Sequence, residues 1–147
     1  MKSLIYLSQP NQEFSRSALT KLATEAAENN KAIGVTGFLR FQHNMFLQYL
    51  EGKSADVGNL LAVISRDKRH TIVNCLYNDV EHARRFSNWN MKFVDEGYLQ
   101  QHSVESFLSN QLQLMKEQTL CDNQWQQLIW QGVDILSECA VNNHKIT

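Results

Sequence analysis

A glutamine on an otherwise apolar strand is the first residue of this sequence whose type could do chemistry. The stretch MFLQYLEG, residues 45–52, has the composition of a β-strand, in which alternate side chains share a face. Gln48 therefore lies between Phe46 and Leu50 on one face. Burying an amide without partners costs roughly 2–7 kcal/mol, depending on the reference state. Because an amide has a donor end and an acceptor end, a buried Gln48 must hydrogen-bond to something specific.

Three more polar side chains stand on elements that are otherwise apolar. Tyr6 lies in the middle of the first expected strand, and Asn29 and Asn30 lie at the end of the helix that follows it. In one interpretation Tyr6 is a core tyrosine, Gln48 satisfies a backbone group, and Asn30 caps the helix in the left-handed conformation. In the other, these side chains line a pocket for a flat, amide-rich ligand, with the apolar stripes of two helices as its walls. The residues alone leave both interpretations open.

Sequence motifs for other chemistries are scarce. The chain has no GxGxxG, P-loop or GxSxG sequence, and its five histidines lack the spacing of metal ligands, so we expect no metal site. A net charge of −1 argues against direct binding of nucleic acid or of an anionic membrane. No apolar run approaches the ~20 residues that span a bilayer. The three cysteines lack CxxC spacing and are typical of reduced thiols, so we expect a cytoplasmic protein.

The polar residues need strands and helices to position them, and the hydrophobic pattern predicts both. One helix should begin with Ser15 as its N-cap and a second with Ser54 as its N-cap, each with apolar residues at i, i+3, i+4 and i+7. The expected strands are 3–9, 34–42, 45–52, 71–80 and about 91–94, with a hairpin turn at His43 and Asn44. This β-α-β-β-α-β order, with one strand added, is the ferredoxin-like arrangement of an α+β fold, in which two helices cover one face of the sheet.

Two further amphipathic helices are expected near the C-terminus, beyond a sheet domain at residues 1–97. The first carries an apolar stripe made of Val104, Phe107, Leu108, Leu112 and Met115. The second, with Asp122 as its expected cap, carries Trp125, Leu128, Ile129, Gly132 and Leu136. Stripes of this width must be buried, either on the open face of the sheet or against a partner chain.

Taken together, these residues resemble the BLUF domain, a family of flavin-binding blue-light sensors. The match runs in order through residues 2–97. It is carried by Tyr6 in the first strand, Asn29 and Asn30 before GVTGFL, FLQYLEG around Gln48, RDKRH after the second helix, and RRFSNWNM with Trp89 and Met91. The resemblance makes residues 1–97 the photosensor and residues 98–147 a helical extension for output and assembly.

The resemblance also implies FAD as the cofactor, held between the two helices above the sheet. Asn30 would hydrogen-bond the edge of the isoalloxazine ring, Gln48 would lie between Tyr6 and the ring, and Ile64 would pack on it. The residues implied in cofactor binding are Leu22, Ala26, Asn29, Asn30, Phe46, Gln48, Leu50, Ile64, Asp67 and His70.

In the mechanism that the resemblance implies, the phenol of Tyr6 gives an electron and a proton through Gln48 after blue light excites the flavin. The amide of Gln48 then rotates or tautomerises and makes a new hydrogen bond to the flavin. Trp89 and Met91 would relay this change to the surface of the domain. The sequence leaves open which of these two side chains lies next to Gln48.

We therefore expect a blue-light photoreceptor rather than an enzyme, signalling through its C-terminal helices to a separate protein partner. The wide apolar stripes also predict a homo-oligomer. The alternative is a regulatory module that binds flavin without photochemistry. An enzyme on the same fold that hydrolyses phosphate esters or acyl phosphates would need an arginine after the first strand, where LSQPNQ has none.

Overall fold

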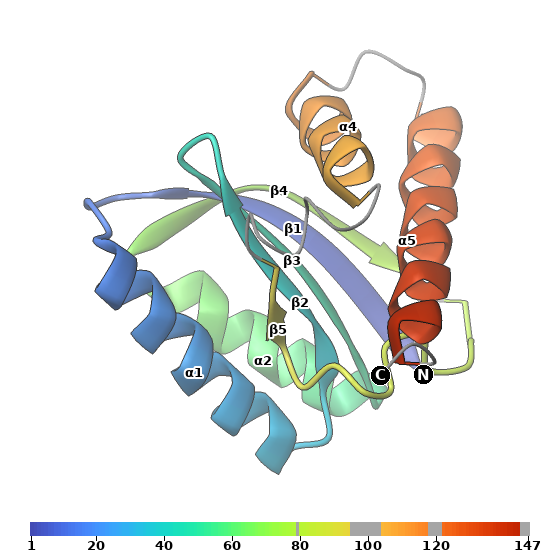
Figure 1. The fold of residues 1–147 in the computed structure, drawn as a ribbon, viewed down its shortest axis with the longest axis horizontal. Helices are drawn as coiled ribbons and strands as arrows, with labels where there is room; N and C mark the ends of the chain where they lie inside the picture. The colour runs from blue at the N-terminus through green and yellow to red at the C-terminus, as the bar shows by residue number, and fades with distance from the viewer. Residues whose placement is uncertain (79, 95–103, 118–121, 145–147) are drawn as a thin grey trace. The chain divides into compact units, whose positions relative to one another are not determined.

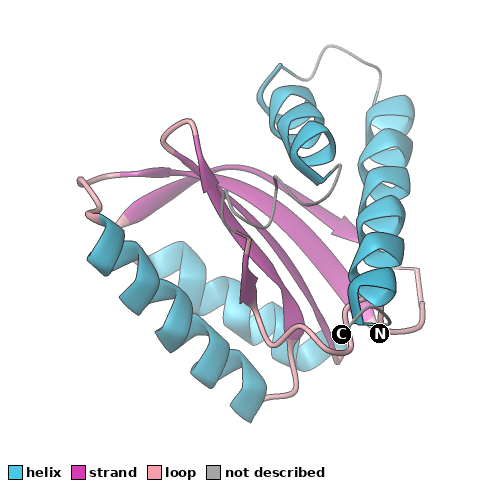
Figure 2. Ribbon diagram, in the orientation of Figure 1, coloured by secondary structure: helices cyan, strands magenta, loops and turns pink. Residues whose placement is uncertain are grey.

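A five-stranded sheet dominates residues 1–94 of the computed structural model (Figure 1, Figure 2). Its strands are β1 (Lys2–Pro10), β2 (Thr36–Gln42), β3 (Met45–Gly52), β4 (His70–Asn78) and β5 (Lys92–Phe93). Their order is β4-β1-β3-β2-β5, and all neighbours are antiparallel except β2 and β5. With two helices on one face, this confirms the predicted ferredoxin-like α+β fold.

The structure describes residues 1–78, 80–94, 104–117 and 122–144. The chain divides into two compact units, residues 1–94 and 95–147. The boundary that we expected at residues 97 and 98 lies outside the described residues.

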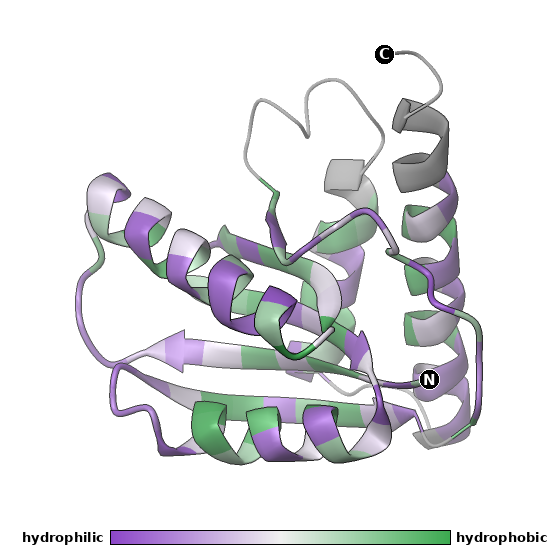
Figure 3. Ribbon diagram, turned by 90° about the horizontal axis from the view of Figure 1, so that it is seen from below, coloured by the Kyte–Doolittle hydropathy of each residue, from purple (hydrophilic) through white to green (hydrophobic). Residues whose placement is uncertain are grey.

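Helices α1 (Arg16–Ala32) and α2 (Ser54–Arg66) cover the same face of the sheet, and hydrophobic and hydrophilic residues alternate along them (Figure 3). The predicted cap of α1 is confirmed, because the Ser15 hydroxyl accepts a hydrogen bond from the Ala18 amide at 3.1 Å. The predicted cap of α2 is wrong. Lys53 takes the extended conformation required at that position, so Ser54 becomes the first helical residue and no side chain caps the helix.

At the other end of α1, the structure does not bear out the interpretation of Asn30 as a helix cap in the left-handed conformation. Asn30 lies inside the helix, and its carbonyl oxygen accepts hydrogen bonds from the amides of Ile33 and Val35. The left-handed residue is Gly34, with φ of 70°, since glycine has no Cβ to penalise that conformation. The Asn30 side chain is 3% exposed and faces the interior.

The hairpin between β2 and β3 turns at His43 and Asn44, as predicted. Both residues have positive φ, 53° and 58°, which is the geometry of a two-residue turn that matches the strand twist. The turn fixes the register of β3, and β3 in turn pairs with β1 so that Tyr6 lies opposite Gln48.

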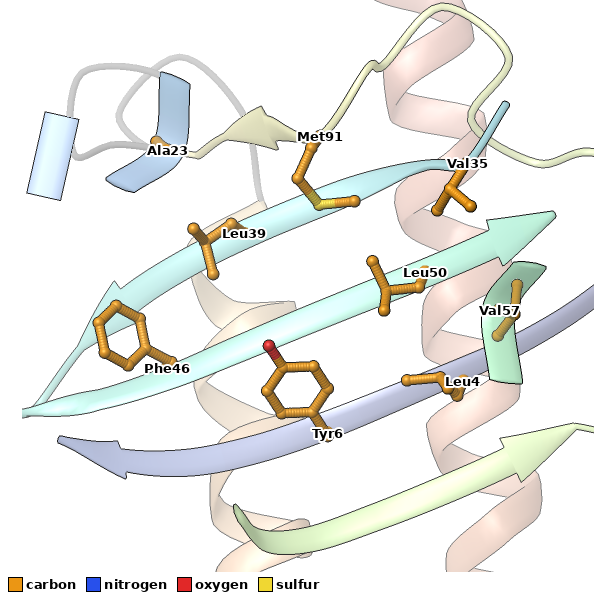
Figure 4. Packing of buried hydrophobic residues seen from close by; sticks show 9 residues of the cluster. All are labelled: Leu4, Tyr6, Ala23, Val35, Leu39, Phe46, Leu50, Val57 and Met91. Carbon is orange, nitrogen blue, oxygen red and sulfur yellow. The ribbon is translucent and has the colours of Figure 1, made fainter. Parts of the chain in front are cut away.

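Each face of the sheet carries its own buried cluster. The cluster on the helix side is shown in Figure 4 and consists of Leu4, Tyr6, Ala23, Val35, Leu39, Phe46, Leu50, Val57 and Met91. On the other face four aromatic rings pack with centroids 5.1 to 6.4 Å apart, namely Phe38, Tyr49, Phe86 and Trp89. Side chains that alternate along β2 and β3 therefore contribute to two different layers.

The second unit contains helices α4 (Val104–Glu117) and α5 (Asp122–His144), which confirms the two predicted C-terminal helices. They pack on each other so closely that a Cβ at Gly132 would lie 2.0 Å from the ring of Phe107. The indole of Trp125 donates to the carbonyl oxygen of Leu114 at 2.9 Å. Leu128, predicted in the apolar stripe, is 41% exposed, because the stripe through Trp125, Ile129 and Leu136 leaves it on the outer side. The side chain of Asp122, the expected cap, lies outside the described residues.

Candidate functional site

A cavity of about 470 Å³ lies between α1, α2 and the sheet, a volume typical of a small-molecule site. Every residue predicted to bind a cofactor lines this cavity, except Leu50. Leu50 is fully buried in the helix-side core instead. The predicted residues on the lining are Tyr6, Leu22, Ala26, Asn29, Asn30, Phe46, Gln48, Ile64, Asp67 and His70.

Tyr6 and Gln48 form a buried hydrogen-bonded pair on the floor of the cavity. The Tyr6 hydroxyl donates to Oε1 of Gln48, and Nε2 of Gln48 donates to the sulfur of Met91 at 3.1 Å. These two partners assign the oxygen and the nitrogen of the Gln48 amide, because the phenol donates to the oxygen and the sulfur accepts from the nitrogen. Tyr6 is 3% exposed and Gln48 5% exposed, and burial raises the pKa of the Tyr6 phenol above its usual value, so it stays protonated. In Figure 4 the Tyr6 hydroxyl and the Met91 thioether point toward each other across β2 and β3.

Met91, and not Trp89, is the residue next to Gln48. Residues two apart on a strand normally share a face, but Met91 has a φ of 54° and its amide donates back to the Trp89 carbonyl oxygen at 2.8 Å. That turn places the two side chains on opposite faces of the sheet. Trp89 joins the aromatic cluster beside Phe86, and the Lys92 ammonium lies 5.0 Å from the centre of its ring. The structure thus answers the question that the sequence left open.

Charged groups gather where α2 ends at the mouth of the cavity. Asp67 accepts hydrogen bonds from Arg69 through both of its oxygens, at 2.6 to 3.1 Å. The Arg69 side chain therefore lowers the pKa of the Asp67 carboxyl group. His70 is held by a 3.1 Å hydrogen bond between Nε2 and the Ile64 carbonyl oxygen, which makes Nε2 the protonated nitrogen.

Comparison with known proteins identifies the family. A family model described as sensors of blue light using FAD matches residues 1–92, which is more than half of the chain. The chain belongs to this family, the BLUF proteins. It is accordingly a blue-light sensor with FAD as its cofactor.

BLUF domains related to this chain are found in much larger proteins. Photoactivated adenylate cyclase subunit beta of Euglena gracilis is 35% identical over 94 residues, which are 63% of this chain and 11% of that protein. The alpha subunit of the same organism is 36% identical over 94 residues, 63% of this chain and 9% of that protein. The chain therefore spans about a tenth of the length of these relatives.

Solved BLUF structures share the fold. BlsA in its photo-activated state matches with a TM-score of 0.62 and 27% identity, covering 90% of this chain and 94% of that one. A bacterial light-regulated adenylyl cyclase matches with a TM-score of 0.63 and 29% identity, covering 76% of this chain and 34% of that one. BlrB in its dark state matches with a TM-score of 0.64 and 23% identity, a likeness of fold that covers 91% and 95% of the two chains.

The residues around the BLUF cavity fit a flavin. Its walls are apolar, from Leu22 and Ala26 on α1 to Ile64 on α2, as a flat ring system requires. The buried amides of Asn30 and Gln48 supply donors and acceptors suited to the polar edge of such a ring. FAD would thus be held by α1, α2 and the floor strands β1 and β3.

The BLUF cavity also includes residues that the sequence prediction missed. Ser8 lies two residues after Tyr6 on the same face of β1, a spacing that could have identified it. Its hydroxyl is fully buried and has no hydrogen-bond partner among the described residues. Arg66 and Arg69, from the RDKRH segment, stand at the mouth and provide positive charge near the end of α2.

Two kinds of site are not seen in the described part of this BLUF protein. Among the residues that the structure describes, no three His, Cys, Asp or Glu side chains gather as a metal site would need. No helix within the described ranges is both long and apolar enough to cross a membrane.

Proposed function

We propose that light sensing by this chain works through electron and proton transfer from Tyr6 by way of Gln48. The observation that carries the proposal is the buried chain of hydrogen bonds from the Tyr6 hydroxyl through the Gln48 amide to the Met91 sulfur, beside the cavity. When bound, FAD supplies the blue-light absorption and a strong electron acceptor. The Tyr6 phenol, protonated and buried, gives one electron and one proton, and Gln48 lies where it can pass that proton on.

The Gln48 amide acts as the switch because its two ends differ. In the present arrangement Oε1 accepts from Tyr6 and Nε2 donates to Met91. Rotation of the amide would turn Oε1 toward the Met91 sulfur, which has no proton to donate. The rotated amide therefore loses its hydrogen bond to Met91, and its Nε2 group must find a new partner. Tautomerisation instead changes which end of the amide carries the proton, which also changes the partners that the amide can satisfy. The electron and proton then return to Tyr6. We take the arrangement with Met91 on Gln48 as the resting, dark state.

The output passes, in this proposal, from Met91 and Trp89 to the C-terminal helices and from there to a separate protein. Residues 1–97 are the sensor domain and residues 98–147 the output extension, and the chain itself is not an enzyme. Two exposed apolar side chains seven residues apart on α5, Leu128 and Ile135, support contact with another protein or with a second copy of the chain. Light scattering in the dark and under blue light measures the resulting assembly.

The test of the proposal is Gln48→Leu, which keeps the size of the side chain and removes both ends of the amide. We expect this variant to bind FAD and to show no stable red-shifted absorption after blue light. Gln9→Leu, at the exposed end of β1, is the control and should keep a normal reversible shift. A normal shift in Gln48→Leu would refute the switch. FAD bound to the unsubstituted chain without any shift would instead indicate a regulatory module without photochemistry.

A further inference from the structure

A second buried polar centre lies on the face of the sheet opposite the cavity. Glu51, near the end of β3, is fully buried. Its Oε1 accepts hydrogen bonds from the Phe86 amide at 2.7 Å and from the Thr36 hydroxyl at 3.2 Å. Its Oε2 accepts from the Tyr49 hydroxyl at 2.9 Å and from the Arg85 amide at 3.0 Å. Each oxygen thus accepts one hydrogen bond from a strand side chain and one from a backbone amide of the segment before Trp89.

Basic side chains surround this carboxylate through shared partners. Arg85 Nη1 donates to the Tyr49 hydroxyl at 3.0 Å, and Arg84 Nη1 donates to the Thr36 hydroxyl at 2.8 Å. Since each of these hydroxyls donates to Glu51, the two arginines polarise the hydrogen bonds that the carboxylate receives. A buried carboxylate persists only when it is paired and hydrogen-bonded in this way.

Phe86 connects the carboxylate to Trp89. Its amide is bound by Glu51, and its ring lies 5.1 Å from the rings of both Tyr49 and Trp89, measured between centroids. Its carbonyl oxygen accepts a hydrogen bond from the Trp89 amide at 3.0 Å. Trp89 is fixed on its far side as well, because its carbonyl oxygen accepts from the Gly37 amide at 2.9 Å.

The segment 85–91 is therefore attached to β3 at both of its ends, on opposite faces of the sheet. At residues 85 and 86 the attachment is to Glu51, and at Met91 it is to Gln48, three residues earlier on the same strand. Loss of the Glu51 bonds would free residues 85 and 86 and leave Trp89 and Met91 to their contacts with the Gly37 amide and with Gln48.

We propose that Glu51 is a positioning residue for the light response: its carboxylate fixes residues 85 and 86 and thereby holds Trp89 and Met91 in their resting places. This inference rests on the proposed function, in which Met91 on Gln48 marks the dark state. The role requires a carboxylate rather than any polar group. Glutamine has the same shape but only one acceptor atom, so its NH₂ group would face a backbone N–H that it cannot accept.

Glu51→Gln tests the inference in the full chain loaded with FAD. In the dark, hydrogen exchange of the amides from residue 85 to residue 91 should become about tenfold faster or more, the equivalent of one lost charge-assisted hydrogen bond. The red shift should still form, because Tyr6 and Gln48 are untouched. Return to the dark spectrum should be slowed about tenfold, because the variant holds the resting arrangement less firmly. Tyr49→Phe removes one side-chain donor to Glu51 and leaves both backbone bonds, so it should change either rate by less than about threefold.

Unchanged exchange at residues 85–91 in Glu51→Gln would overturn the inference, as would a recovery rate equal to that of the unsubstituted chain or of Tyr49→Phe. The exchange experiment needs no photocycle, so it tests the role of Glu51 even if the unsubstituted chain shows no red shift. The absence of a red shift in the unsubstituted chain would refute the proposed function and leave the role of Glu51 to the exchange result. Should Glu51→Gln fail to fold, Glu51→Asp keeps the charge but draws the carboxylate back by one methylene from the Arg85 and Phe86 amides. That variant should also show faster exchange at residues 85 and 86 and a slowed recovery, and unchanged exchange there would again overturn the inference.

Discussion

Removing the Tyr6 hydroxyl is the perturbation whose effect can be worked out most completely from the structure. Tyr6→Phe keeps the ring in the helix-side core and deletes the donor to Gln48 Oε1. Because Gln48 is 5% exposed, water cannot replace that donor freely. An unsatisfied buried acceptor costs about 1–3 kcal/mol in the free energy of unfolding. For a chain of 147 residues this corresponds to a melting temperature lower by roughly 2–10 °C.

The functional effect of Tyr6→Phe should be far larger than its effect on stability. Phenylalanine has no proton to give and is not readily oxidised, so the variant should bind FAD and show no red shift after blue light. Absorption spectra before and after illumination measure the shift, and thermal unfolding in the dark with FAD bound measures the stability.

Tyr49→Phe is the matched control, because Tyr49 is the other buried tyrosine among the described residues and its hydroxyl is also hydrogen-bonded. It lies on the opposite face of the sheet, bound to Glu51 and Arg85. We expect a similar loss of stability and a retained red shift. A normal red shift in Tyr6→Phe, or its loss in both variants, would show that the photochemistry does not depend on the pair of Tyr6 and Gln48.

Three more predictions concern the backbone, the cavity and the buried phenols. Gly37→Ala should destabilise the protein by more than about 3 kcal/mol, because the new Cβ would lie 1.9 Å from the Tyr49 carbonyl oxygen at a φ of 150°. Gly58→Ala should instead stabilise α2 by about 1 kcal/mol, because a Cβ there would have nothing within 4 Å. Denaturant unfolding measures both changes. Asn30→Ala should weaken FAD binding about tenfold by removing one buried hydrogen bond, and an unchanged affinity by titration would place Asn30 outside the binding site. Because burial raises the pKa of Tyr6 and of Tyr49, their contribution to the free energy of unfolding should be fully present below about pH 10, where the phenols of the unfolded chain titrate, and should fall as the pH rises further. Phenolate absorption that grows at the same pH in folded and unfolded protein would contradict this.

The strands and helices were predictable because each has a clear apolar period and a local signal at its ends. Ser15 marks the start of α1, and His43 with Asn44 marks the hairpin, both through interactions between residues close in sequence. The error at Ser54 arose because two adjacent residues could each cap the start of α2, and Lys53 is the one with the extended backbone conformation. At the end of α1 the left-handed conformation falls on Gly34 and not on Asn30, because glycine has no Cβ to oppose it.

The site was predictable in part. Alternation along the strand placed Gln48 between Phe46 and Leu50 on one face. The family resemblance added its pairing with Tyr6 and the residues on α1 and α2. The position of Met91 depends on one positive φ, which has no signal in the sequence because methionine rarely adopts it. Glu51 was equally hidden. A glutamate at the end of a strand is usually solvated, and its burial here depends on a segment more than thirty residues later.

The central claim is that Gln48 and Tyr6 make this chain a reversible blue-light switch. The measurement that tests it most directly is the absorption spectrum of the purified protein with FAD, recorded in the dark, after a blue flash, and during recovery. We expect a flavin spectrum that shifts slightly to the red and returns to its starting form in the dark. A flavin spectrum that stays the same after the flash, or a protein that cannot be loaded with FAD, would contradict the claim.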